Sequence, residues 1–226
     1  MMAGSTSEAG LDSPQPRRAY TSPVAWATLL GVLLLGLALD LSSKYWSFQS
    51  VADVPVVLNR DQLLADRTFN PIPYHDGIRV LPGRLLDFRL VINRGAVFGL
   101  GADQRGFFIV FTLAALVVGL VVFGRFTTSR SRLAHVSLGL ILAGGIGNLY
   151  DRIVYGVVRD FLHMLPGWHL PFGWRWWGNN PEVFPWIFNV ADVMLLSGMV
   201  MLMIHINRAE AARDKHRPVE AKTGDA

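Results

Sequence analysis

The sequence predicts an all-α membrane protein with four transmembrane helices and a small extracytoplasmic β-sheet and loop region. Hydrophobic residues make up 51% of the 226 residues and charged residues only 17%, whereas a soluble domain carries about 25% charge. The apolar residues gather in four runs, each long enough to cross about 30 Å of hydrocarbon. Since backbone groups cannot stay unpaired in lipid, each run must be a helix.

The first predicted span covers residues 23–46. It follows a tail, residues 1–22, that is rich in Ser, Gly and Pro and is expected to be disordered. A signal peptide is the alternative interpretation, but it would have a shorter apolar region followed by an A-x-A-like cleavage site, which is absent here. Asp40 and Lys44 at the far end of the run also indicate a helix that is retained.

The other three predicted spans cover residues 106–123, 133–149 and 186–206. The run at 133–149 is rich in glycine, which permits close contact between helices in lipid. Residues 23–206 are therefore expected to form one four-helix membrane domain, and residues 207–226 are expected to form a second tail.

The distribution of Lys and Arg predicts that both termini lie in the cytoplasm. The connection 124–132 holds three arginines and no acidic residue, and the tail after Asn207 is also basic. Segments 47–105 and 150–185 then lie on the outer side of the membrane. They also contain arginines, but long segments cross the membrane regardless of charge.

The two outer segments differ in composition. In the first, apolar stretches at Val54–Leu58 and Leu85–Ile92 are expected to form a small sheet on the membrane surface. Farther along, five tryptophans lie between Trp168 and Trp186. Tryptophan at this density is typical of the headgroup layer, which favours an aromatic belt, with a lid over a substrate as the alternative.

Composition also excludes several classes of function. The absence of cysteine excludes disulfides, thiol nucleophiles and thiolate metal sites. The net charge of +4 is small for a nucleic-acid binder, and the basic residues follow the membrane topology. The six histidines show no H-E-x-x-H spacing. We therefore expect no nucleic-acid partner, no metal and no other cofactor.

Two acidic residues near the outer ends of the last two spans are the candidate catalytic residues. Asp192 is expected about six residues into the fourth span, where a carboxylate is costly unless it faces a polar cavity or a partner such as arginine. Asp160 follows the third span, and an outer connection joins these spans. The two carboxyl groups can therefore face each other, and they cannot both ionise cheaply. The charged carboxylate can take a proton from water, and the neutral carboxyl group can donate a hydrogen bond to a scissile carbonyl. This arrangement predicts the chemistry of an aspartic protease.

Other polar residues are expected at the same level as this pair. Asp40 and Lys44 are four residues apart, which favours a structural tie, and Asn189 shares a helix face with Asp192. The further polar positions are Asn93 and Gly95 before the second span and Asn148, Asp151 and Arg152 at the end of the third.

Five short blocks in this order resemble the lipoprotein signal peptidases, the signal peptidase II family. Each block alone is a weak signal, but together they are highly specific and extend over most of residues 40–192. The blocks are DLSSK at Asp40–Lys44, NRGAVFG at Asn93–Gly99, GGIGNLYDR at Gly144–Arg152, GVVRDF at Gly156–Phe161 and FNVAD at Phe188–Asp192.

The resemblance implies an aspartyl endopeptidase that removes the signal peptide from diacylglyceryl-modified prolipoproteins, cutting just before the lipidated Cys. It places the catalytic dyad on Asp160 and Asp192, with the active site at the extracytoplasmic face of the bacterial inner membrane. The implied partners are lipid-modified prolipoproteins and membrane lipid, and we expect a monomer. Substrate-binding or supporting roles fall on Asn93, Gly95, Asn148, Arg152 and Asn189, and structural roles fall on Asp40, Lys44 and Asp151.

Two alternatives are weaker. Other intramembrane proteases do not fit, because Asn148 stands where a GxGD motif needs Asp, and Lys44 has no supporting motif for a Ser–Lys pair. A small transporter or channel with Asp192 in an ion path is the alternative from another class. It would need internal repeats or broken helices, and the sequence shows neither.

Overall fold

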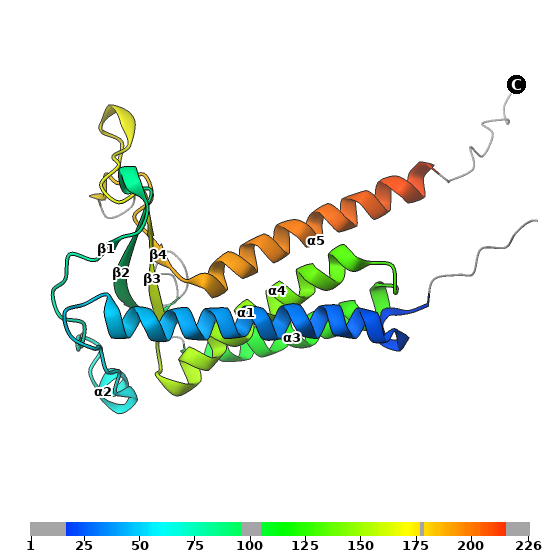
Figure 1. Ribbon diagram of the computed structural model, residues 1–226, viewed down its shortest axis with the longest axis horizontal. Helices are drawn as coiled ribbons and strands as arrows, with labels where there is room; N and C mark the ends of the chain where they lie inside the picture. The colour runs from blue at the N-terminus through cyan, green and yellow to red at the C-terminus, as the bar shows by residue number, and fades with distance from the viewer. Residues whose placement is uncertain (1–16, 96–104, 177–178, 216–226) are drawn as a thin grey trace, which may run out of the picture.

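The structure is a computed structural model that describes residues 17–95, 105–176 and 179–215. Within these residues, four long helices have the length and hydropathy of membrane spans, which confirms the predicted helical membrane fold. They run from one end of the molecule towards a small sheet at the other (Figure 1). The helices are α1 (Pro23–Ser50), α3 (Arg105–Phe126), α4 (Arg132–Val154) and α5 (Val190–Lys215), with a short helix α2 (Arg60–Ala65) after α1.

The long helices differ from the predicted spans mainly at their ends. Three of them extend beyond the predicted spans at 23–46, 106–123 and 133–149. The fourth begins at Val190 rather than at residue 186, because the residues before it form a strand. Asp192 is therefore the third residue of α5 and lies in its first turn, not six residues into the helix as predicted.

Helix α4 is the centre of the bundle. In the most apolar 18-residue stretch of α4, 67% of the residues are buried, compared with 11% in the corresponding stretch of α3. Its glycines give each neighbouring helix a close approach, as the sequence predicted. An added Cβ at Gly139 would meet α1, one at Gly144 would meet α5, and one at Gly145 would meet α3.

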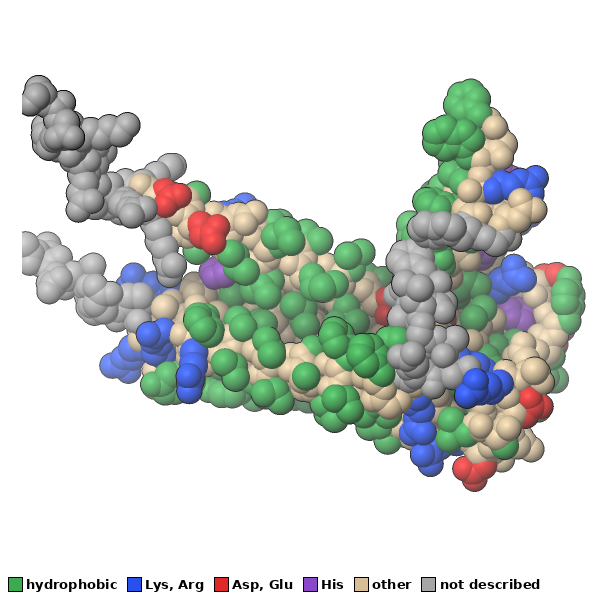
Figure 2. All heavy atoms as spheres, turned by 180° about the vertical axis from the view of Figure 1, so that it is seen from behind, with side chains coloured by type: hydrophobic (Ala, Val, Ile, Leu, Met, Phe, Trp, Pro, Cys, Tyr) green, Lys and Arg blue, Asp and Glu red, His purple; other side chains and the backbone are tan. Residues whose placement is uncertain are grey.

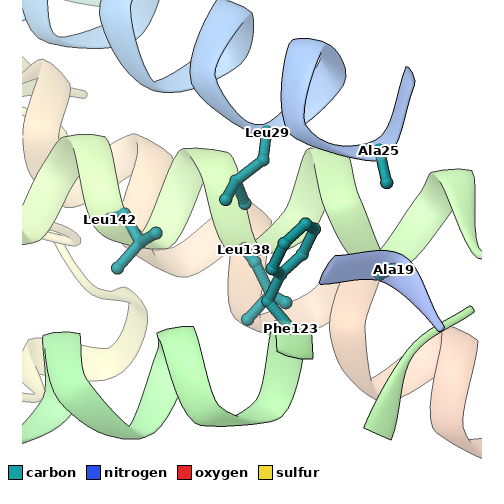
Figure 3. Packing of buried hydrophobic residues seen from close by; sticks show 6 residues of the cluster. All are labelled: Ala19, Ala25, Leu29, Phe123, Leu138 and Leu142. Atoms are coloured by element: carbon teal, nitrogen blue, oxygen red, sulfur yellow. The ribbon is translucent and has the colours of Figure 1, made fainter. Parts of the chain in front are cut away.

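Two apolar clusters hold the helices at opposite ends. One joins the start of α1 to α3 and α4 (Figure 3). The other packs the end of α1 against the sheet and so fixes the height of the sheet over the bundle. The first cluster contains Ala19, Ala25, Leu29, Phe123, Leu138 and Leu142, and the second contains Phe48, Val51, Ala52, Val56, Leu90 and Phe161.

The segment 17–22 corrects the prediction of a disordered tail over residues 1–22. It is ordered because it pairs with the connection between α3 and α4: the Ala19 N–H donates to the carbonyl oxygen of Thr127 at 3.1 Å. Ser22 then caps α1 by accepting a hydrogen bond from the Ala25 N–H. Residues 1–16 and 216–226 lie outside the described residues.

The sheet has four antiparallel strands in sequence order. Its second strand lies where the sequence predicted one, but Val54–Leu58 contains no strand. Val56 packs in the apolar cluster beneath the sheet instead, and its N–H donates to the Phe48 carbonyl. The strands are β1 (Ile78–Arg79), β2 (Leu86–Asn93), β3 (Val158–Met164) and β4 (Ile187–Phe188).

The tryptophan-rich segment forms an arm between β3 and β4. Its two sides pair through the Val183 N–H to Trp168 carbonyl bond at 2.7 Å. The arm projects sideways from the sheet, away from the helices (Figure 1), and hydrophobic side chains cover its tip (Figure 2). Phe172 and Trp174 are exposed there, while Trp177 lies outside the described residues. The aromatic belt and the lid both stay predictions.

We expect the substitution Gly144→Ala to lower the free energy of unfolding by about 1–3 kcal/mol. The added Cβ would overlap the backbone carbonyl of Ala191, which cannot swing aside as a side chain can. The matched control is Gly31→Ala in α1, where an added Cβ meets nothing within 4 Å. Unfolding of the purified variants in detergent measures the difference. Equal stability of the two variants would contradict close packing of α4 against α5.

Candidate active site

Asp192 is held at the start of α5 by a reciprocal pair of hydrogen bonds with Asn189. The Asp192 N–H donates to the side-chain oxygen of Asn189 at 3.1 Å, and the Asn189 N–H donates to the Asp192 carboxylate at 3.1 Å. This is a capping box, which satisfies two backbone donors that a helix start leaves unpaired. It explains why the helix begins at Val190, and it fixes the orientation of the Asp192 carboxylate.

Asp160 lies on β3 and is 1% exposed. Both of its carboxyl oxygens accept hydrogen bonds from asparagine side chains. Asn93 at the end of β2 donates at 2.9 Å, and Asn189 donates at 2.6 Å. The pairing of β2 with β3 sets the first contact, since it places Val91 opposite Asp160 and Asn93 opposite Val158.

The structure brings the two aspartates to a common set of asparagines. Asn189 contacts Asp160 through its side chain and Asp192 through its backbone. Asn148 of α4 completes the set: its amide group donates to Asp192 at 2.8 Å and accepts from Asn189 at 3.0 Å. Asp192 is half-buried, whereas Asp160 and Asn189 are almost fully buried. Two carboxyl groups in unequal surroundings therefore share one small polar cluster.

Burial raises the pKa of Asp160 from its ordinary value of 3.8 to about 8, and the negative charge of Asp192 acts in the same direction. The hydrogen bonds from Asn93 and Asn189 oppose this shift, since they favour the charged form. At neutral pH the Asp160 carboxyl group is therefore mostly protonated. The pair can hold one proton and one negative charge together, which is the state that acid–base hydrolysis requires.

A buried ion network lies beneath the two aspartates. The Lys44 ammonium lies 2.8 Å from Asp40 and 3.4 Å from Asp151, and all three side chains are 0% exposed. The same ammonium donates to the side-chain oxygen of Asn148 at 3.0 Å. Asp151 also bonds the Arg159 guanidinium at 2.8 Å. Two cations thus balance two carboxylates, and the network ties α1 and α4 to β3.

Asp40 extends this network to α5, because its second carboxyl oxygen accepts a hydrogen bond from the Ala191 N–H at 2.9 Å. The geometry fits the structural role predicted for Asp40, Lys44 and Asp151, although that role stays a prediction. The sequence assigned no role to Arg159, which precedes Asp160 in the RDF block. A basic residue inside a short block shared with a family was the available signal.

Arg152 and Gly95 lie beside the cluster. The Arg152 guanidinium donates to the Asn148 carbonyl at 3.3 Å and to the Gly95 carbonyl at 3.4 Å. The Gly95 N–H in turn donates to the side chain of Asn93 at 3.0 Å. Arg152 therefore holds the turn that follows β2. Residues 96–104, which include the rest of the NRGAVFG block, lie outside the described residues.

Metal ligands do not gather at this site. Among the residues that the structure describes, no group of three or more His, Asp or Glu side chains could hold a metal ion. The polar atoms that contact Asp160 and Asp192 are amide donors of asparagines and backbone N–H groups. These donors orient the two carboxyl groups.

The chain is similar in sequence to one known protein family and to its members. The family model described as signal peptidase (SPase) II matches residues 32–208. A lipoprotein signal peptidase of Methylorubrum extorquens is 33% identical over 186 residues, which cover 80% of this chain and 85% of that protein. A lipoprotein signal peptidase of Geobacter metallireducens is 32% identical over 176 residues, which cover 76% of this chain and 97% of that protein.

A solved structure, described as that of a bacterial membrane enzyme, has the same fold. It matches with a TM-score of 0.60 and 22% identity and covers 87% of this chain and 95% of its own. The family match and the relatives confirm the resemblance that the five sequence blocks predicted, and the solved structure shows the same fold.

We expect the substitution Lys44→Met to lower the free energy of unfolding by about 3–5 kcal/mol, because it leaves two buried carboxylates without their common cation. The control Arg208→Met removes an exposed cation near the far end of α5 and should change stability by no more than about 0.5 kcal/mol. Denaturant unfolding in detergent distinguishes the two variants. A small loss for Lys44→Met would mean that the buried network contributes little to stability.

Proposed function

Since the chain belongs to the signal peptidase II family, membrane peptidases that remove signal peptides from prolipoproteins, we propose that Asp160 and Asp192 form its catalytic dyad. The substrate is a prolipoprotein whose Cys carries diacylglycerol, and the enzyme cuts just before that Cys. The observation that carries the proposal is the sharing of Asn189 by two carboxyl groups of unequal burial. This arrangement supplies a charged base and a neutral acid without a metal.

The unequal surroundings assign the roles within the dyad. Asp160 holds the proton, because burial raises its pKa to about 8. Asp192 is the carboxylate that takes a proton from water, and it is more exposed than Asp160. It also lies in the first turn of α5, where the helix dipole favours a negative charge.

The reaction follows from these roles. The Asp192 carboxylate accepts a proton from water while the water oxygen bonds to the scissile carbonyl carbon. Asp160 transfers its proton to the carbonyl oxygen, which gives a neutral tetrahedral intermediate. When the C–N bond breaks, Asp192 passes its proton to the leaving amine, and Asp160 regains one from the intermediate's hydroxyl group. The products are a signal peptide with a new carboxyl group and a lipoprotein with a free Cys amino group.

The supporting residues position these groups. Asn93, Asn148 and Asn189 hold the two carboxyl groups at fixed orientations through the hydrogen bonds described above. Arg152 and Gly95 hold the turn after β2 next to the pair. A bound peptide would cross this turn on its way to the dyad, so we assign both residues to the placement of substrate.

The protein is a multi-pass bacterial membrane protein, and we propose that both of its termini lie in the cytoplasm. The arginine-rich connection 124–132 supports this orientation by the positive-inside rule. The dyad lies at the other end of the helices, at the extracytoplasmic face. A diacylglyceryl group in the outer leaflet would hold the scissile bond at this depth, which supplies much of the orientation that catalysis needs. Every residue of the site comes from one chain, so a monomer is sufficient.

We expect Asp160→Asn and Asp192→Asn each to lower cleavage of a diacylglyceryl-modified prolipoprotein at least about a hundredfold, because each removes one half of the acid–base pair. The control Asp61→Asn, an exposed aspartate in α2, should cleave at the wild-type rate. The assay uses the purified full chain in vesicles and separates precursor from product on a gel. The unlipidated precursor, run beside it, should stay uncut.

Each outcome bears on a different part of the proposal. Cleavage that persists in either dyad variant would exclude that aspartate from catalysis. Equal cleavage of the unlipidated precursor would exclude the lipid from recognition. A transporter with Asp192 in an ion path would instead lose coupled flux in Asp192→Asn, whereas a peptidase keeps its ability to bind substrate.

The pKa of Asp160 also predicts the pH dependence of activity. Because the neutral form of Asp160 is required, cleavage should fall as pH rises through about 8. Rates measured from pH 6 to pH 10 with saturating substrate test this limb, with Asp61→Asn as the matched control. If the rate stays level well above pH 8, a group other than Asp160 must be the acid.

Stability should follow the same titration. The folded-state pKa of Asp160 lies above the ordinary value of 3.8, so the folded protein binds this proton more tightly than the unfolded chain does. The contribution of Asp160 to stability is therefore full below about pH 3.8 and is lost as pH rises through about 8. Melting temperatures of Asp160→Asn should change less with pH over this window than those of the wild type.

A further inference from the structure

A groove of about 670 Å³ lies at the end of the helices that is remote from the two aspartates. It runs along α3 and is closed on one side by the ordered segment before α1. Basic side chains gather at this end of the molecule (Figure 2). The residues lining the groove are Arg18, Tyr20, Val117, Leu120, Val121, Gly124 and Arg125.

The wall of the groove formed by α3 is apolar and open. Val117, Leu120 and Val121 are 61%, 48% and 45% exposed, so each has surface that a ligand can cover. Gly124 continues the same face one turn farther on, and an added Cβ there would meet nothing within 4 Å. From Val117 to Gly124 the helix rises about 10 Å. This length suits part of an acyl chain lying along the helix.

The mouth of the groove carries two arginines, Arg18 and Arg125. The Arg18 guanidinium donates to the backbone carbonyl of Arg125, which ties the two residues together. The segment that carries Arg18 is held by two further backbone bonds to the connection after α3, including Ser129 N–H to the Arg17 carbonyl at 2.8 Å. The position of Arg18 is therefore fixed by contacts with the backbone of residues 125–129.

The positive charge at this mouth has little acidic compensation. Residues 17–39 and 105–150, which supply every lining residue, contain no Asp or Glu. Glu210 and Asp214 belong to α5, which diverges from α1 and α3 at this end (Figure 1). Two guanidinium groups beside an apolar wall favour a ligand with an anionic head and an apolar tail.

Aromatic residues place this mouth at a membrane–water interface. The Trp26 indole N–H donates to the Tyr20 carbonyl at 3.0 Å, and the Trp26 ring packs edge-on against Phe123 with centroids 4.7 Å apart. Tyr and Trp prefer the headgroup level. Arg18 and Arg125 thus lie at the depth of lipid phosphates, while the α3 wall lies at the depth of the acyl chains.

From these observations we propose that the groove binds one anionic phospholipid of the surrounding leaflet. The phosphate lies between the guanidinium groups of Arg18 and Arg125, and one acyl chain lies along α3 over Gly124 and Val121. A zwitterionic lipid brings its own cation to the same mouth, so an anionic lipid such as phosphatidylglycerol is preferred. The site would tie the segment before α1 to the end of α3, and it is independent of the catalytic proposal.

The experiment measures lipid retention by the purified full chain. The protein is reconstituted in vesicles with equal amounts of phosphatidylglycerol and phosphatidylcholine, extracted, and analysed by native mass spectrometry. We expect one phosphatidylglycerol per chain to be retained over phosphatidylcholine. Arg125→Gln should weaken its retention about fivefold, the effect of one cation at a membrane surface. This variant keeps the backbone carbonyl that Arg18 bonds.

Two further variants complete the test. Gly124→Leu fills the open wall and should also lose the lipid, whereas Arg132→Gln, which removes an exposed arginine outside the groove, should keep it. Cleavage of the lipidated precursor by each variant verifies that it is folded, since the dyad lies at the other end. Equal retention of both lipids by the wild type, or equal losses in Arg125→Gln and Arg132→Gln, would overturn the proposal. If Gly124→Leu does not fold, the comparison of Arg125→Gln with Arg132→Gln decides the test.

Discussion

The geometry of the site depends on the contacts of one buried group, the ammonium of Lys44. An unpaired ammonium in this dry interior would be very unfavourable, so acceptors must surround it. Each acceptor then fixes a different part of the site. Asp40 also accepts a hydrogen bond from the Ala191 N–H in the first turn of α5, and Asp151 accepts one from the Arg159 N–H of β3. Asn148 offers its oxygen to Lys44, which turns its amide nitrogen towards Asp192. One cation thus sets the position of a strand, a helix start and an amide group.

The proposed chemistry depends on the unequal burial of the two aspartates, which the contacts around Lys44 maintain. Asp160 is almost fully buried on a strand, whereas Asp192 is half-buried at a helix start, where backbone N–H groups favour its charge. Asn189 lies between them and serves both, because its side chain donates to one carboxyl group and its backbone to the other. In the proposed mechanism, the strand makes Asp160 the acid and the capping box makes Asp192 the base.

The sequence predicted the features that depend on composition and on short blocks. Long apolar runs predicted the helices, and the glycines of α4 predicted close packing, because both follow from lipid as a solvent. The sequence missed that Asp160 lies on a strand, since a seven-residue segment with a buried charge does not alternate clearly. The position predicted for Asp192 was too deep in the fourth span. The capping box with Asn189 makes the helix begin at Val190, although the apolar run begins earlier. Pairing between distant segments, such as β2 with β3, left no local signal.

The location of the proposed dyad, where α5 begins next to β3, reconciles two opposing needs. A low dielectric constant is needed to keep Asp160 protonated near neutral pH, yet hydrolysis consumes a water molecule that must reach the scissile bond. The centre of the bundle would satisfy only the first need, and an exposed loop only the second. Where α5 begins beneath β3, the sheet buries Asp160 while Asp192 keeps part of its surface exposed. In the proposed mechanism, a substrate anchored in the leaflet by its own lipid reaches this depth without leaving the membrane, so the fold does not have to enclose it.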